Sequence, residues 1–306
     1  MPVPMPMTVS PSLATASCGT QLSPECSPQT VAAPGDLTAR AEFCARLMSP
    51  QSTGLAETGF NVFIHPTQTL ASEALRDALA GSALHATRNP FNARLVDSEI
   101  ARRASNIVEA LHIASMSSET VDLNMLPAVQ ALLVYQCMRL FSLGFISQQT
   151  QAERDNVVLQ IWASRLQLQL SSSDSDLMKE SWQSWIEKEA IRRTLICIEL
   201  AQDTYTYLRG NWPAGLRCHH DLKFNAQKVL WEAKSAATWR LICEDPVHPS
   251  LPCNMLHLHE DIRDAFPGDL NDIGILSRAA GEGIENMNDW LGRDGVALQR
   301  WGQVLI

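Results

Sequence analysis

The sequence lacks the features that would place a protein in a membrane or on a phosphate backbone. A membrane-spanning helix needs about 18 or more apolar residues in a row, and even the most hydrophobic stretch, 126–145, is interrupted by Gln130, Gln136 and Arg139. The 24 Lys and Arg are outnumbered by 33 Asp and Glu, which gives a net charge of -9. Because phosphates repel an acidic chain, we expect no direct nucleic-acid binding and no membrane contact.

Closely spaced cysteine pairs, which often bind metals, are also missing. The eight cysteines are scattered, and the two nearest in sequence, Cys18 and Cys26, are too far apart for a C-x-x-C pair. Cys137 and Cys197 lie among apolar neighbours, where a cysteine usually behaves as a small buried hydrophobe. We therefore expect reduced thiols and no cofactor.

Sequence signatures of common catalytic sites are absent or incomplete. The chain has no G-x-S-x-G, P-loop or H-E-x-x-H motif. His257, His259 and Asp261 resemble the H-x-H-x-D start of a metal-hydrolase loop, but the next position is Ile262 and not histidine. We interpret these histidines as surface residues and predict no enzyme, catalytic residue or metal. A helical metal-dependent hydrolase that uses this region is the alternative.

Proline is concentrated at the N-terminus, where we expect disorder. Residues 1–35 hold seven of the 16 prolines and many Ser, Thr and Ala, a composition that buries too little apolar surface to fold. From residue 36 to 306, apolar residues recur three and four positions apart, which is typical of amphipathic helices. The sequence thus predicts an all-α, multi-helix bundle that follows a disordered, Pro-rich leader.

Seven segments show the helical pattern most clearly, and Pro, Gly and polar runs separate them. They are residues 70–79, 96–113, 126–145, 152–170, 177–208, 226–243 and 273–291.

Tryptophans at helical spacing predict a helix face that packs into the core. Trp182 and Trp185 precede Glu189, which is placed to reach both Arg192 and Arg193 at the i+3 and i+4 positions. An aromatic and basic nucleic-acid surface is the other interpretation. Indole rings at this spacing are usually core anchors, and Glu189 offsets the arginine charges, so we favour the core.

Two further features have structural explanations. Trp231 and Trp239 stand eight positions apart, so we expect both on one stripe of a single helix. His65 precedes Pro66, which restricts it to an extended or turn conformation, and we expect it to fix a loop against the bundle.

Taken in order, several segments resemble the regulatory domain found downstream of the zinc finger or zinc cluster in one group of fungal transcription factors. Residues 63–66 resemble an F-I-H-P element, and 128–136, which include Gln130 and Tyr135, resemble A-x-Q-A-L-L-x-Y-Q. Residues 182–194 resemble W-x-x-W-I-x-x-E-x-x-R-R-T, and 230–239 resemble L-W-E-A-x-S-A-x-x-W. The likeness extends from about residue 36 to residue 292.

The resemblance implies a nuclear transcription regulator whose motif residues form a structural core. Family members usually carry a zinc module upstream, whereas this N-terminus has only Cys18 and Cys26, so we expect a regulator without its own DNA-binding domain. The implied partner is a DNA-binding regulator or a homo- or heterodimer, and a small apolar effector is a second candidate ligand. Such domains often accompany regulators of secondary-metabolite gene clusters. A dominant-negative partner of a full-length regulator is a further alternative.

Overall fold

The computed structural model describes residues 34–116, 125–141, 146–171, 181–210, 222–245, 250–255 and 257–302. Within these ranges the chain is almost wholly helical, which confirms the predicted all-α class, and its one sheet has two short antiparallel strands. The predicted leader lies outside the described residues except for Pro34 and Gly35, which begin the first helix. The described helices include none that is both long enough and apolar enough to span a bilayer.

The helices of the first part of the chain are long. They are α1 (Pro34–Met48), α2 (Gln51–Thr58), α3 (Glu73–Ala86), α4 (Ala93–Met116), α5 (Leu126–Phe141), α6 (Ile146–Ser171) and α7 (Trp182–Leu208).

The elements that follow α7 are shorter. They are β1 (Lys223–Asn225), α8 (Lys228–Trp231), α9 (Ala236–Cys243), β2 (Pro252–Asn254), α10 (Leu258–Asp261), the 3-10 helix η2 (Pro267–Asp269), α11 (Asp272–Glu282), α12 (Ile284–Leu291) and α13 (Gly295–Trp301). Residues Lys223, Phe224 and Asn225 of β1 pair with Asn254, Cys253 and Pro252 of β2.

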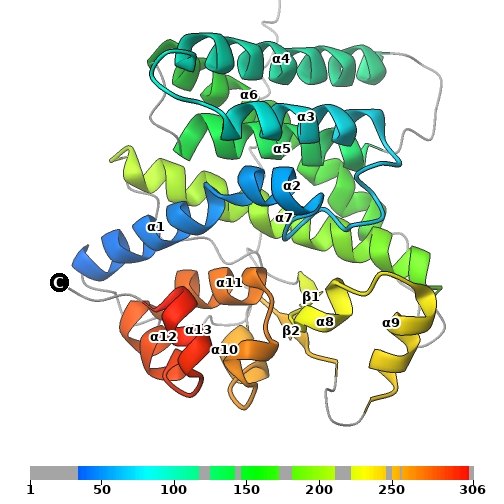
Figure 1. Cartoon of the computed structure of the whole chain (residues 1–306), viewed down its shortest axis with the longest axis vertical. Helices are drawn as coiled ribbons and strands as arrows, with labels where there is room; N and C mark the ends of the chain where they lie inside the picture. The colour runs from blue at the N-terminus through cyan, green and yellow to red at the C-terminus, as the bar shows by residue number, and fades with distance from the viewer. Residues whose placement is uncertain are drawn as a thin grey trace, which may run out of the picture. The chain divides into compact units, whose positions relative to one another are not determined.

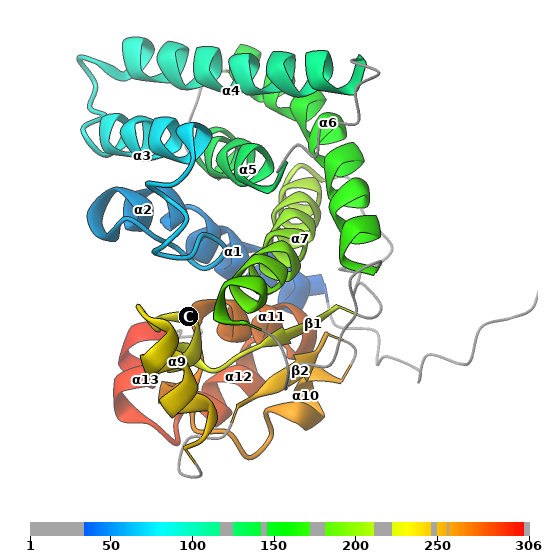
Figure 2. The same ribbon diagram turned by 90° about the vertical axis from the view of Figure 1, so that its right-hand side faces the viewer.

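Helix α7 lies between two groups of elements. Figures 1 and 2 show α2 to α6 on one side of it and the elements from β1 to α13 on the other. Helix α1 packs along α7 and also touches α5 and α11, so it contacts both groups. Long-range packing on α7 therefore joins the two parts of the chain.

Helix α5 is the most deeply buried element because other helices cover it on every side. It contacts α1, α2, α3, α4, α6 and α7, and its residues from Val129 to Leu140 are all buried. Its polar side chains find partners inside: Gln136 Nε2 donates to the carbonyl of Ala152 at 2.7 Å, and Arg139 pairs with Asp155 at 2.7 Å. Because α5 is buried on all of its faces, it is a core helix of the bundle.

One predicted helix, 226–243, is in fact two. Helix α8 ends at Trp231 and α9 begins at Ala236, because the Ser235 side chain caps the new helix by accepting a hydrogen bond from the Thr238 amide at 3.1 Å. Trp231 and Trp239 thus lie on different helices, and the expectation of a single stripe was wrong. Helices α1 and α2 are not among the seven predicted segments.

The predicted helix 273–291 is also divided. Gly283 has φ 91° and ψ 162°, a backbone conformation almost confined to glycine, and it separates α11 from α12. Because Gly283 is buried, the change of chain direction is fixed within the packed interior.

We expect Gly283→Ala to lower the free energy of unfolding by about 1–3 kcal/mol, since a side chain is strained at this φ. Gly281→Ala is the matched control: a Cβ there meets no atom within 4 Å. Inside a helix, alanine should leave stability unchanged or raise it by up to about 1 kcal/mol. Urea unfolding followed by circular dichroism measures both variants, and equal stabilities would contradict the expectation.

Candidate functional site

Most of the residues that the resemblance singles out meet around the first half of α7. Buried there are His65, Gln130, Trp185, Glu189, Arg193 and Trp231, and half-buried there are Pro66, Trp182, Arg192 and Trp239. Tyr135 is buried elsewhere, where its hydroxyl donates to Asp77 Oδ2 of α3 at 2.7 Å. Segments far apart in the sequence thus converge on one helix.

The centre of this region is the buried ion pair of Arg193 and Glu189. Arg193 is fully buried, and its Nε donates to Glu189 Oε1 at 2.8 Å. Its Nη1 donates to the carbonyl of Val62 at 3.1 Å, and its Nη2 to the carbonyl of Asn225 at 2.6 Å. The guanidinium carbon lies 4.0 Å from the ring centroid of Trp231. A single side chain of α7 therefore contacts the loop after α2, strand β1 and helix α8.

Burial removes this ion pair from water, so each charge depends on its partner inside the protein. Loss of water lowers the pKa of Arg193, while the charge of Glu189 acts in the opposite direction. Glu189 Oε1 also accepts a hydrogen bond from the Asn225 amide at 2.9 Å, so this carboxylate oxygen accepts two hydrogen bonds. Arg192 lies farther from it, at 3.7 Å from Oε2. Of the two arginines placed to reach Glu189, Arg193 is the one that forms the close pair.

An aromatic cluster surrounds the ion pair. The His65 ring lies edge-on to Trp231 and Trp182, with centroid distances of 5.1 and 6.1 Å. Trp185 lies 6.5 Å from Trp231 and 5.6 Å from Trp239. These separations are typical of aromatic pairs that stabilise protein interiors. The cluster joins α7, α8 and α9 to the loop that contains His65.

His65 is buried, and no carboxylate of the described residues forms an ion pair with it. Its Nδ1 lies 2.8 Å from Thr67 Oγ1, and its backbone amide donates to Gln68 Oε1 at 2.9 Å. Burial, and secondarily the charge of Arg193, lowers the pKa of His65 to about 4. The ring is therefore neutral at neutral pH.

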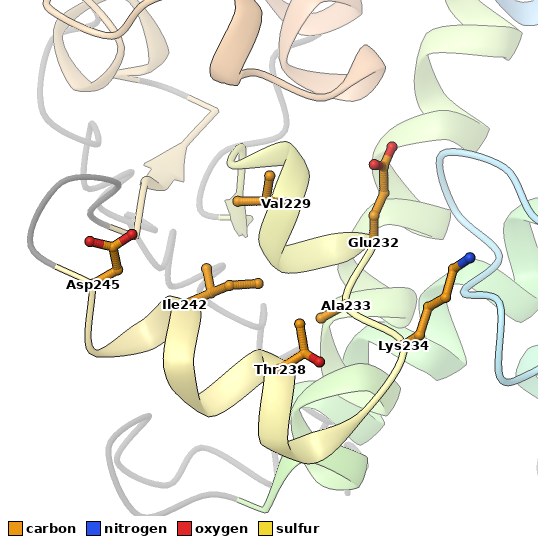
Figure 3. A pocket seen from close by; sticks show the side chains of 7 residues that line it. All are labelled: Val229, Glu232, Ala233, Lys234, Thr238, Ile242 and Asp245. Atoms are coloured by element: carbon orange, nitrogen blue, oxygen red, sulfur yellow. The ribbon is translucent and has the colours of Figure 1, made fainter.

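A surface groove lies between α8 and α9, beside the aromatic cluster. This α8–α9 groove has a volume of about 540 Å³ and is lined by Val229, Glu232, Ala233, Lys234, Thr238, Ile242 and Asp245. Figure 3 shows Val229 and Ile242 on facing sides of the groove, with Lys234 and Asp245 at opposite ends. Its middle is apolar and its ends are charged.

A second groove, the Trp231 groove, also adjoins α8. It has a volume of about 370 Å³, and Arg193 and Trp231 of the buried centre contribute to its wall. The rest of its lining comes from Glu232 after α8, from residues 50–62, from the start of α11 and from the end of α13, and includes Glu57, Asp272, Arg300 and Trp301. Glu232 lines both grooves.

The grooves were not predicted from the sequence. Glu232 lies within the L-W-E-A element, which was the one sequence feature that pointed to this region. Nothing in the sequence relates Ile242 or Arg300 to that element. They reach the grooves only because the chain breaks between α8 and α9 and because α13 folds back towards α2.

The histidine region that suggested a hydrolase adopts a turn. His257 is exposed before α10, and Asp261 Oδ2 accepts a hydrogen bond from the Asn254 amide at 2.7 Å, closing the turn after β2. The side chain of His259 lies outside the described part. Among the described residues, no group of three or more His, Cys, Asp or Glu side chains is placed to hold a metal.

Known proteins include one with clear similarity over most of the chain. Transcription factor gsfR2 of Penicillium aethiopicum is 30% identical over 269 residues, which are 83% of this chain and 62% of that protein. The chain thus spans less than two thirds of the length of this relative. No family model matches the sequence, and no solved structure matches it significantly. The similarity supports the resemblance to fungal transcription factors.

We expect Glu189→Gln to lower the free energy of unfolding by about 3–5 kcal/mol, because it leaves the buried guanidinium of Arg193 without its counter-ion. Arg192→Gln is the control, since Arg192 contacts the same carboxylate only at 3.7 Å, and it should cost less than about 1 kcal/mol. Chemical denaturation measures both, and a similar loss in the two variants would be evidence against the central role of the pair.

We expect His65 to make stability depend on pH. The unfolded chain takes up the imidazole proton near the ordinary pKa of 6.5, and the folded chain near pH 4, so stability present at neutral pH is lost as the pH falls between these values. The loss amounts to about 3 kcal/mol. In His65→Gln this component should be absent, so its unfolding free energy should fall less between neutral pH and pH 4 than that of the unmodified chain. The His65 ring signals in NMR should show no protonation until about pH 4.

Proposed function

We propose that the chain is the regulatory module of a transcription regulator and that it acts by binding another molecule. The observation that carries this proposal is the similarity to transcription factor gsfR2 over 83% of the chain. The helical fold is consistent with it, because the motif residues of α7 and α8 serve as a buried frame beside open grooves. In this proposal the chain is not an enzyme.

The α8–α9 groove is the binding surface that we propose. Its volume of about 540 Å³ falls within the usual range of ligand sites, about 300–1,000 Å³. Val229 remains 45% exposed and Ile242 is half-buried, so a bound apolar group would remove both from water. An apolar segment of a protein partner fits this lining, and a small apolar effector is the second candidate.

Charge supports an indirect mode of action. The chain carries a net charge of -9, which disfavours contact with DNA phosphates. We propose that it reaches DNA through a DNA-binding regulator or a dimer and that it acts in the nucleus. By analogy with the family that the chain resembles, we propose that its target is a secondary-metabolite gene cluster. Imaging of a fluorescent fusion and transcript profiling after gene deletion test these two points.

Fusion of the chain to an unrelated DNA-binding domain should change transcription of a reporter that carries the matching DNA site. Ile242→Glu should abolish the effect, because it places a charge in the apolar middle of the groove. Leu241→Glu is the matched control: Leu241 is the preceding residue of α9, is 70% exposed and does not line the groove.

Circular dichroism should show that both variants keep their helices. An unchanged reporter with the unmodified fusion would contradict the proposal. If that inactive fusion still co-purified with a full-length regulator, the dominant-negative alternative would replace it. If the purified chain hydrolysed a substrate and His257→Ala abolished that activity, the alternative of a metal-dependent hydrolase would be favoured.

A further inference from the structure

The Trp231 groove combines carboxylates with indole rings. Glu57, Glu232 and Asp272 contribute three carboxylates to its lining, and Trp231 and Trp301 contribute two indoles. Carboxylates and the faces of aromatic rings are the groups with which proteins hold organic cations.

The positive charges of this groove do not cancel the carboxylates. Arg193 is already paired with Glu189 at 2.8 Å inside the protein. Arg300 is the other cation in the lining, and it pairs with Asp272 at 3.3 Å. Burial raises the pKa of Glu232, while Lys228 outside the lining and, more weakly, Arg300 and Arg193 within it lower that pKa. With the two pairs counted as neutral, the lining keeps Glu57 and Glu232 as carboxylates in excess.

Arg300 itself shows how a guanidinium fits at the edge of the groove. Its Nη2 lies 3.3 Å from Asp272 Oδ1, and its guanidinium carbon lies 4.2 Å from the ring centroid of Trp301. The cation is thus held between a carboxylate and an indole. Arg300 is also half exposed, so an incoming cation would compete with it for Asp272.

Burial leaves the carboxylates poorly solvated. Loss of water raises the pKa of Glu232 and of Asp272 above their usual values. A cation that enters the groove would replace part of the missing water as a partner for these charges. The free energy of binding would therefore depend most on Glu232, because Asp272 already has Arg300 as a close partner, whereas Glu232 feels the lining arginines only at longer range.

We propose that the Trp231 groove binds an organic cation, a guanidinium or ammonium group, with Glu232 as its counter-ion and the half-buried indole of Trp301 as its wall. This site is additional to the α8–α9 groove of the proposed function. Its test measures binding to the purified chain, so it succeeds or fails whatever the transcription reporter shows.

Isothermal titration of the purified full chain with ethylguanidinium, and with the end-blocked tripeptide Ala-Arg-Ala, tests the proposal. Saturable binding of both with similar affinity indicates that the cation alone is recognised. Much tighter binding of the tripeptide indicates a basic side chain presented by a protein. Absence of saturable binding by either probe would overturn the proposal.

Two variants should change the affinity in opposite directions. Glu232→Gln should weaken binding by about threefold to tenfold because it removes the counter-ion, and Arg300→Gln should strengthen it by about threefold because it removes the internal competitor. Glu244→Gln, an exposed carboxylate at the end of α9 that lines neither groove, should leave the affinity unchanged. If Glu232→Gln fails to fold, the exposed Arg300→Gln still decides. Equal affinity in Arg300→Gln and the unmodified chain would contradict the assignment.

Discussion

A fully buried arginine with one carboxylate partner is the constraint on which the C-terminal part of this fold depends. The guanidinium of Arg193 forms an ion pair with the carboxylate of Glu189 and donates hydrogen bonds to the backbone carbonyls of Val62 and Asn225. An uncompensated charge in this position would cost several kcal/mol, so the loop after α2 and strand β1 must both close on α7 for the arginine to be tolerated. The ion pair therefore specifies which segments meet, besides any stability that it adds.

The motif residues and the groove residues have different roles. Trp185, Trp231 and Glu189 are buried and define a rigid frame, whereas Glu232, Ile242 and Arg300 lie at the surface where another molecule reaches them. A frame that is held by ion pairs and ring contacts keeps these surface side chains in fixed positions, which lowers the entropy cost of binding. The L-W-E-A element takes part in both roles, because its Trp231 is buried in the frame and its Glu232 lines both grooves.

The long helices were predictable because each has a strong period of its own. Helices α4, α5 and α6 overlap the predicted segments 96–113, 126–145 and 152–170, and α7 ends at Leu208 as predicted. The breaks after Trp231 and at Gly283 were missed, because apolar residues keep their three-and-four spacing across both. Capping by Ser235 and the positive φ of Gly283 redirect the chain without interrupting that pattern.

By itself, the sequence determined the all-α class, the packing of Trp185 into the interior and the reach of Glu189 towards Arg193, because all three follow from spacing along one helix. Only the tertiary structure decided that the Arg193 guanidinium stacks on Trp231 and that Asp272 and Arg300 meet beside Glu232. These contacts join residues far apart in the chain. Their partners are selected by the burial and charge balance of the whole fold, which no local pattern contains.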